Sequence, residues 1–332
     1  FSWMDLALIV TTADVFGDAE ADLLAKARKQ SVPSILVFNK IDSVPLSESF
    51  RIRAQSFGIP FCEVSAQSRD GVEALRALMV RVLSTLHEPD PDFLSGLVKP
   101  GDTVVLVTPI DTGAPKGRLI LPQVQAVRSV LDADAQCVVV RENRLAQILA
   151  SLKARPAFVM TDSQVVRNVV KVVPESIPVT TFSIEMSVMK SDLTALARGA
   201  AALTTLKPGD RVMICETCSH HPQPDDIGRK KIPRWLAQRI GGAIETDIVV
   251  GKDFPSDLTP YKIIIQCGGC VVTRRHMLAR LRASQEQSVP MTNYGIAISF
   301  LQGALTRALS LHPQALEAYN KEKARLQGLL AP

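Results

Sequence analysis

The sequence predicts an α/β protein made of three consecutive parallel-sheet α/β units. Short apolar runs alternate with stretches of helical periodicity along the chain, and strands that are separated by helices pair in parallel. At 332 residues the chain is too long for one ordinary hydrophobic core. Changes in composition divide it into three predicted domains, residues 1–88, 94–190 and 192–320.

The first segment alternates three strands with three helices. The predicted strands are 6–12, 35–39 and 60–65, and the predicted helices are about 18–30, 46–57 and 70–86. The stretch "HEPDPDF" that follows is rich in proline and acidic residues, so we expect it to be a linker.

The other two segments repeat this alternation. In the second, we predict strands at "DTVVLVTPI", "AQCVVV" and "AFVMT" and helices at about 122–131, 143–153 and 163–171. It contains no catalytic constellation, so we expect a structural role as a subunit interface. In the third, we predict helices at 192–204, 273–284 and from about 296, and strands at 211–215, "ETDIVVG" and 261–266.

Composition limits the possible functions. The net charge is +5, but basic and acidic residues are interspersed, so we expect no nucleic-acid partner. No apolar run approaches the roughly 18 residues of a membrane helix, and no secretory signal is present. We therefore expect a cytoplasmic protein with six reduced cysteines. The opening "FSWMDLALIV" is typical of a strand already inside a domain, so we expect the natural chain to begin earlier.

Two short motifs follow consecutive strands of the first segment. "NKID" places Asn39, Lys40 and Asp42 after one strand, and "SAQ" places Ser65 and Ala66 after the next. This is the pattern with which P-loop GTPases bind guanine, at the carboxyl ends of parallel strands. The Asp42 carboxylate suits the N1–H and amine of guanine, Asn39 would brace the loop, Lys40 would pack along the ring, and a backbone N–H near Ala66 would meet O6. The alternative is a pair of capped turns.

The phosphate-binding half of such a domain is missing from the sequence. No G-x-x-x-x-G-K-[ST] motif occurs anywhere in it. We expect the first segment to be the C-terminal half of a P-loop GTPase domain, with the phosphate loop and the Mg²⁺ ligand preceding Phe1. We therefore predict no catalytic residue here, and expect tight GTP binding and GTPase activity only in the intact protein.

A second set of residues could hold a metal. "CETCSHHP" carries Cys215, Cys218 and two histidines, and "QCGGC" carries Cys267 and Cys270, each after a predicted strand. If the two strands are parallel in one sheet, both loops emerge at the same edge, with room for a helix and a further strand between them. The two glycines would let the backbone curl so that both thiolates face one point.

Several kinds of site fit these residues. An iron–sulfur cluster needs soft thiolates and tolerates a fourth ligand other than cysteine. Zinc would take Cys218, His220, Cys267 and Cys270 as a closed tetrahedral set. A redox pair would need only the last two cysteines, and a purely structural role stays open.

The remaining cysteines and histidines are expected to be structural. Cys215 lies inside a strand and is predicted to be a core residue, as are Cys62 and Cys137. The expected positions of three histidines are at the surface or at helix caps: His87, His276 and His312.

Taken together, the motifs resemble one known family, the FeFe-hydrogenase maturation GTPases (HydF). The resemblance extends over nearly the whole chain. Beside the motifs above, it rests on "PIDTGAPKGRLILPQVQ" (109–125), "TDSQV" (161–165), "DDIGRKKIPR" (225–234) and "TNYG" (292–295).

The resemblance implies a GTPase domain, a dimerisation domain and a cluster-binding domain with a role in higher assembly. It implies a 4Fe–4S cluster on Cys218, Cys267 and Cys270, with His220 completing the C-x-H motif. The implied function is a scaffold that receives a di-iron precursor from radical-SAM maturases and delivers it to apo-FeFe-hydrogenase. A homodimer or higher oligomer is also implied. The alternative is a regulatory or tRNA-related small GTPase with an appended zinc-binding interaction module.

One residue departs from the family pattern. The family typically has a histidine directly before C-x-x-C, and here that position is Gln266. Glutamine is a poor iron ligand, so His220, His221, another chain or water is left for the fourth position. The sequence leaves open whether this position is exchangeable by design or whether maturation activity has been lost.

Overall fold

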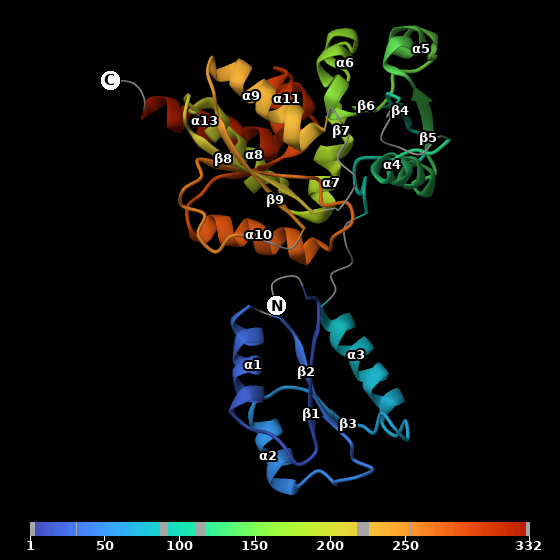
Figure 1. The fold of residues 1–332 in the computed structure, drawn as a ribbon. Coiled ribbons are helices and arrows are strands. Elements are labelled where there is room, and N and C mark those ends of the chain that lie inside the picture. The colour runs from blue at the N-terminus through green and yellow to red at the C-terminus, as the bar shows by residue number, and fades with distance from the viewer. Residues whose placement is uncertain are drawn as a thin grey trace. The chain divides into compact units, whose positions relative to one another are not determined.

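The chain divides into two compact units, Phe1–Asp90 and Pro91–Pro332. The computed structural model describes residues 4–30, 32–86, 92–110, 117–217, 226–251 and 254–329. Each unit is built from parallel strands and helices, and three parallel sheets follow one another along the chain (Figure 1). The predicted fold class is confirmed.

The first unit contains a three-stranded parallel sheet of order β1-β2-β3. All six predicted elements are present, within about three residues of their expected ends. The strands are Ala7–Thr12 (β1), Ser34–Asn39 (β2) and Phe61–Glu63 (β3), and the helices are Asp18–Lys29 (α1), Glu48–Ser56 (α2) and Val72–Leu86 (α3).

The central strand β2 is buried on both faces. Leu36 and Phe38 pack in a cluster with residues of α1 and α2, and Ile35 and Val37 pack against residues of α3. This alternation follows from the two-residue period of a strand. The Phe38 ring meets Phe16 edge to face at a centroid distance of 6.0 Å. The two guanine-motif loops thus leave a rigid strand and its neighbour.

The second unit begins with a four-stranded parallel sheet of order β5-β4-β6-β7. Its strands are Thr103–Val107 (β4), Gln136–Val140 (β5), Phe158–Thr161 (β6) and Val179–Thr181 (β7). Its helices are Leu121–Asp132 (α4), Leu145–Ser151 (α5), Val166–Val172 (α6) and Phe182–Lys190 (α7). Sequence reasoning missed β7 and α7, because a three-residue strand beside Pro178 carries no periodic signal of its own.

The same unit contains a second parallel sheet, of order β11-β10-β8-β9. Its strands are Arg211–Glu216 (β8), Glu245–Val250 (β9), Ile263–Gln266 (β10) and Met291–Asn293 (β11). Its helices are Leu193–Ala200 (α8), Ile232–Ile240 (α9), Arg274–Glu286 (α10), Tyr294–Leu301 (α11), Leu305–Ala308 (α12) and Pro313–Gly328 (α13). Helix α10 covers one face, and α9 and α11 lie on the other (Figure 1).

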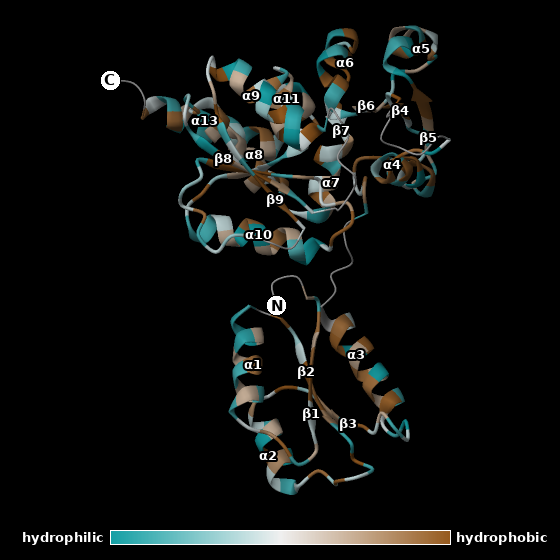
Figure 2. Ribbon diagram, viewed as in Figure 1, coloured by the Kyte–Doolittle hydropathy of each residue, from teal (hydrophilic) through white to brown (hydrophobic). Residues whose placement is uncertain are grey.

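Strands β8 and β10 form the middle of this sheet. The side chains of Ile263, Ile264 and Ile265 are fully buried. Figure 2 shows hydrophobic residues in the middle of this sheet, while β8 begins with Arg211 and β10 ends with Gln266. Burying each of these isoleucine side chains contributes about 1.5–3 kcal/mol. Because β9 lies on one side of β8 and β10 on the other, the chain changes direction between β8 and β10. The carboxyl edge at such a switch point is where open α/β sheets bind ligands.

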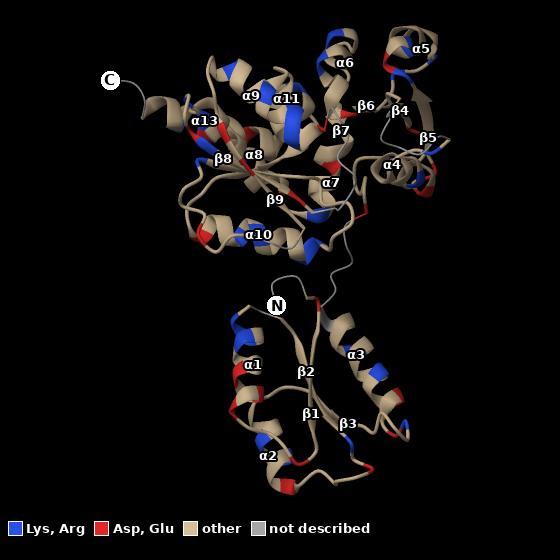
Figure 3. Cartoon of the chain, in the orientation of Figure 1, with Lys and Arg blue, Asp and Glu red and all other residues tan. Residues whose placement is uncertain are grey.

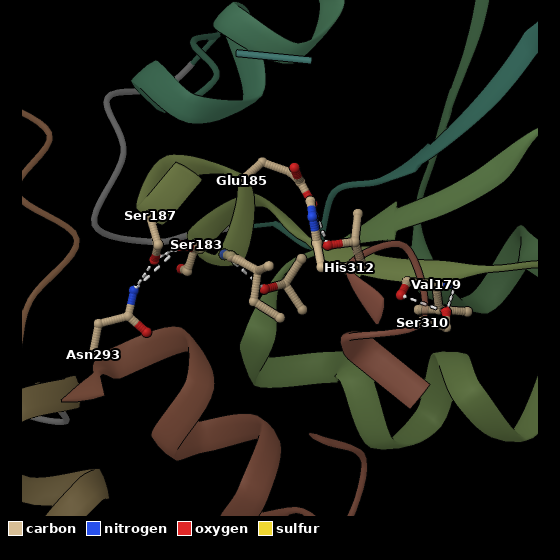
Figure 4. A network of polar contacts seen from close by, with 10 residues as sticks. Val179, Ser183, Glu185, Ser187, Asn293, Ser310 and His312 are labelled. Atoms are coloured by element: carbon tan, nitrogen blue, oxygen red, sulfur yellow. Dashed lines mark hydrogen bonds and ion pairs between the residues drawn. The ribbon is translucent and has the colours of Figure 1, made fainter. Parts of the chain in front are cut away.

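Polar contacts join the two sheets of the second unit. Figure 4 shows Glu185 of α7 facing His312, and Asn293 of β11 facing Ser187 of α7. The His312 Nε2 and Glu185 Oε1 atoms are 2.8 Å apart, and the Asn293 amide donates to Ser187 Oγ. Helix α7 is thereby fixed against both sheets.

Charge is distributed evenly over the described surface. Basic and acidic residues occur on both units (Figure 3), although helices α6 and α9 carry basic residues only. Within the described ranges, no helix combines the length and the apolar character needed to cross a membrane.

Candidate functional site

The structure brings the guanine-motif residues together at the carboxyl ends of β2 and β3. The Ala66 N–H donates to Asn39 Oδ1 at 3.0 Å, and Ser65 Oγ donates to Asp42 Oδ1 at 2.5 Å. Asn39 therefore braces the neighbouring loop, as expected. The Ala66 N–H, which was expected to meet guanine, is bonded to Asn39 in this structure.

The Asp42 carboxylate is exposed and fixed in orientation. Hydrogen bonds from the Ser65 and Ser43 hydroxyls lower its pKa below the ordinary value, with the Ser65 bond as the larger cause. Lys40 has a φ of +64°, a left-handed conformation that turns the loop directly after the strand. The Asp42 carboxylate is therefore an ionised hydrogen-bond acceptor at the surface, with the Lys40 charge nearby and the Ser65 loop beside it.

The two cysteine loops emerge side by side at the switch point of the last sheet. Strands β8 and β10 are parallel neighbours, with Gln266 paired to Cys215. The predicted common edge is confirmed, and α9 and β9 form the helix and strand expected between the loops. Beyond β8, the Thr217 N–H donates to Cys267 Sγ at 3.2 Å, and Thr217 Oγ1 lies 3.0 Å from the same sulfur. Cys218 is the next residue in the sequence.

The Cys-Gly-Gly-Cys turn is closely packed. Gly269 has a φ of +65°, and a Cβ atom there would lie 2.6 Å from Met277 Sδ. Glycine is favoured here because it adopts a positive φ readily and because it has no Cβ atom to displace the Met277 side chain. Burial raises the pKa of the Cys270 thiol, and the neighbouring Cys267 raises it further.

The residue before this turn has a defined partner. The side chain of Gln266 is fully buried, and its Oε1 accepts a hydrogen bond from Arg280 Nη1 at 2.8 Å. Its Nε2 donates to Cys267 Sγ and to the Cys215 carbonyl oxygen, both at 3.4 Å. Sequence reasoning identified Gln266 but missed Arg280, which lies on α10 one helix beyond the motif.

An ion pair between a buried carboxylate and a partly exposed guanidinium lies beside the same edge. Glu216 Oε2 accepts from Arg229 Nη2 at 2.9 Å. A Cβ atom on Gly228 would lie 2.1 Å from the Tyr294 hydroxyl oxygen and 2.9 Å from Glu216 Oε1. Among the described residues, the Tyr294 hydroxyl has no hydrogen-bond partner, and burial raises its pKa. Gly228 and Arg229 belong to the stretch "DDIGRKKIPR", and Tyr294 belongs to "TNYG". Sequence reasoning assigned no role to these three residues.

The other cysteines and histidines differ in part from expectation. Cys215 is fully buried as predicted, and burial raises its thiol pKa to about 12. Cys62 and Cys137 are only half-buried, because they lie at the margins of their cores. The prediction of a surface or cap position was wrong for His276, which is buried. His312 does occupy the N-cap position of α13, but its partly exposed side chain pairs with buried Glu185 and does not cap the helix. His87 lies outside the described residues.

Part of the predicted ligand set also lies outside the described residues, namely Cys218, His220 and the alternative His221. Among the residues that the structure describes, no three Cys, His, Asp or Glu side chains gather as a metal site. The described cysteines nevertheless suit a cluster, because Cys267 Sγ accepts from two N–H groups that favour a thiolate and contacts the Thr217 hydroxyl, which can also donate to it. The buried Tyr294 hydroxyl, unpartnered among the described residues, is a further polar atom at this edge.

The fold and these sites define a multidomain α/β protein with a cysteine-bearing loop at a switch point. Residues 93–191 match the hydrogen maturase F dimerization domain, and residues 194–311 match the hydrogen maturase F tetramerization domain. The chain belongs to the hydrogen maturase F family, and it takes part in hydrogenase maturation. The two matched domains indicate a homo-oligomer, in agreement with the interface role expected for the second segment.

Among solved structures, the chain aligns with a protein described as LpCGTa in complex with UDP. The alignment has 10% sequence identity, covers 96% of this chain and 93% of that chain, and gives a TM-score of 0.18. So low a TM-score supports no argument about fold or ligand.

Proposed function

We propose that this protein is a GTP-binding scaffold that carries a 4Fe–4S cluster and delivers a di-iron precursor during FeFe-hydrogenase maturation. The observation that supports it is the Cys267 sulfur, which lies at the switch point with two contacts from Thr217. Thr217 directly precedes Cys218 in the sequence. The last described residue before Cys218 therefore lies beside Cys267 at one edge of the sheet.

The proposed ligands are Cys218, Cys267 and Cys270, with His220 as a candidate for the fourth position. When bound, the cluster supplies one-electron chemistry and an exchangeable iron position. The protein's own residues hold and shield it: Thr217 and Gln266 donate toward Cys267, and Gly269 allows the turn to Cys270. Burial of the Cys267 side chain, of which only 8% is exposed, restricts water at that ligand.

Guanine recognition is proposed for the first unit. The Asp42 carboxylate would accept from guanine, and the Asn39–Ala66 contact would hold the opposite loop. Mg²⁺ and tight phosphate binding would require groups that only the intact protein supplies. GTP binding would then regulate the association of partners, which we propose to be radical-SAM maturases and apo-FeFe-hydrogenase in the cytoplasm.

Anaerobic reconstitution with iron and sulfide tests the cluster. We expect about four irons per chain with charge-transfer absorption in the visible range. Alanine substitution of Cys218, Cys267 or Cys270 should abolish the cluster, whereas Cys215→Ala should retain it, since that thiol is buried and protonated.

Two outcomes would contradict the proposal. A reconstituted sample that stays colourless and binds one zinc would indicate the interaction-module alternative instead. A cluster that survives the loss of Cys267 would show that the ligand set is wrong.

A further inference from the structure

We infer that Gln266 is a positioning residue for the Cys267 thiolate rather than an iron ligand, and that Arg280 holds it in this role. The inference rests on the proposed function, because it concerns a cluster bound by Cys267. It assigns a role to the one residue that departs from the family pattern, in which histidine occupies this place.

The orientation of the Gln266 amide follows from its partner. A guanidinium has only N–H donors, so the atom that Arg280 Nη1 approaches at 2.8 Å must be the amide oxygen. The amide nitrogen consequently faces the other way, toward Cys267 Sγ at 3.4 Å. The side-chain atom of Gln266 that could best bind iron, its amide oxygen, is hydrogen-bonded to Arg280 and faces away from the sulfur, whereas an N–H group is directed at the sulfur.

Arg280 is itself held firmly in place. Its side chain is only 3% exposed, its Nη2 donates to the Gly251 carbonyl oxygen at 2.5 Å, and its guanidinium lies 5.0 Å from the centre of the Phe254 ring. These contacts come from the end of β9 and from the segment that follows it. Turning the Gln266 oxygen toward iron would remove one of the two acceptors of a buried cation, which is costly.

The arrangement has a redox consequence. Reduction adds negative charge to a cluster, so an N–H donor on a ligand sulfur and a nearby buried cation both stabilise the reduced form. The Gln266–Arg280 pair therefore raises the reduction potential of the cluster. A histidine in the same place would instead offer a ring nitrogen to iron.

Two substitutions separate positioning from ligation. Gln266→Met removes the N–H and every hard donor atom, and Gln266→Glu removes the N–H but keeps an oxygen for Arg280. We expect both reconstituted variants to keep the iron content of the parent and to show a more negative midpoint potential, with altered EPR signals of the reduced cluster. Gln164→Met is the matched control, because the Gln164 oxygen also accepts from a cation, Lys231 Nζ at 2.8 Å, and it should leave the potential unchanged.

The outcomes are distinct. Loss of iron in Gln266→Met with retention in Gln266→Glu would show that residue 266 is a ligand and would overturn the inference. An unchanged or more positive potential in both variants would also overturn it. If the parent protein itself binds no cluster, the proposed function fails first, and iron analysis of the parent shows this before any variant is measured. Thermal unfolding of both variants identifies any that has not folded.

Discussion

Glu185 and His312, which are 127 residues apart in the sequence, are paired in the interior of the second unit at 2.8 Å. Glu185 is fully buried and also accepts a hydrogen bond from Thr180 Oγ1. Figure 4 shows the pair between α7 and the segment that begins α13. The contact joins a residue of the range that matches the dimerization domain to the residue directly after the range that matches the tetramerization domain.

This pair predicts a stability effect. His312→Ala should lower the free energy of unfolding of the second unit by about 3 kcal/mol, because it leaves a buried carboxyl group without one of its partners. Urea denaturation followed by circular dichroism measures the loss. Glu185→Gln in the same background should recover part of it, since the amide carries no charge. A loss below about 0.5 kcal/mol in His312→Ala would contradict the structural role.

Gly269 predicts a second effect on stability. Gly269→Ala combines a left-handed φ with a Cβ atom 2.6 Å from Met277 Sδ, so we expect it to cost more than about 2 kcal/mol and to lower the iron content on reconstitution. Thermal unfolding and iron analysis measure the two effects.

Two glycines serve as controls for this substitution. A Cβ atom on Gly268 would meet only ordinary contacts at 3.7 Å and beyond, so Gly268→Ala should be nearly neutral. Gly303 has a φ of +72° but open space around it, so Gly303→Ala should show the backbone cost alone, about 1 kcal/mol. Equal costs at positions 269 and 303 would mean that the Met277 contact is unimportant.

Cys215 should resist alkylation in the folded protein. Burial raises the pKa of the Cys215 thiol from 9.0 to about 12. At pH 9 the thiol is therefore neutral in the folded protein, whereas the same thiol is partly ionised in the unfolded chain. The stability that this burial contributes is complete below about pH 9 and is lost as the pH rises toward 12. Iodoacetamide labelling at pH 9, read by mass spectrometry, should modify half-buried Cys137 before Cys215. If both thiols were labelled at the same rate without denaturant, Cys215 would not be buried and protected as the structure indicates.

Asp42 predicts a change in base preference. Asp42→Asn replaces an acceptor by a donor, so it should weaken binding of guanine nucleotides by about tenfold or more and favour xanthine nucleotides, whose O2 can accept. Titration with fluorescent nucleotides, on this chain and on one with a complete GTPase domain, measures the preference. Because the pKa of Asp42 is lowered by Ser65 and Ser43, guanine binding should persist in mildly acidic buffer. Ser65→Ala is the companion variant. It removes the main hydrogen bond that lowers the Asp42 pKa, so guanine binding should be lost at a higher pH than in the parent protein.

Much of the fold follows from local sequence. The apolar runs of β2 and β10 and the periodic stretches between them are set by neighbouring residues, so most strands and helices were predicted close to their observed ends. The positions of Asp42 and Cys267 after strands were equally predictable. Parallel strands end at one edge of a sheet, which brings such residues together without further information.

The tertiary structure decided which side chains complete the sites. Gln266 has a defined orientation because Arg280, from the following helix, donates to its oxygen, and His312 is partly buried because its ring faces Glu185 of α7. Neither partner is set by periodicity, since each contact depends on how a helix packs over a distant segment. The same is true of β7, whose three residues become a strand through pairing with β6. The sequence by itself determined most of the strands and helices and the loops that carry the motifs. Long-range packing determined the short strand β7 and the partners that orient the side chains of the sites.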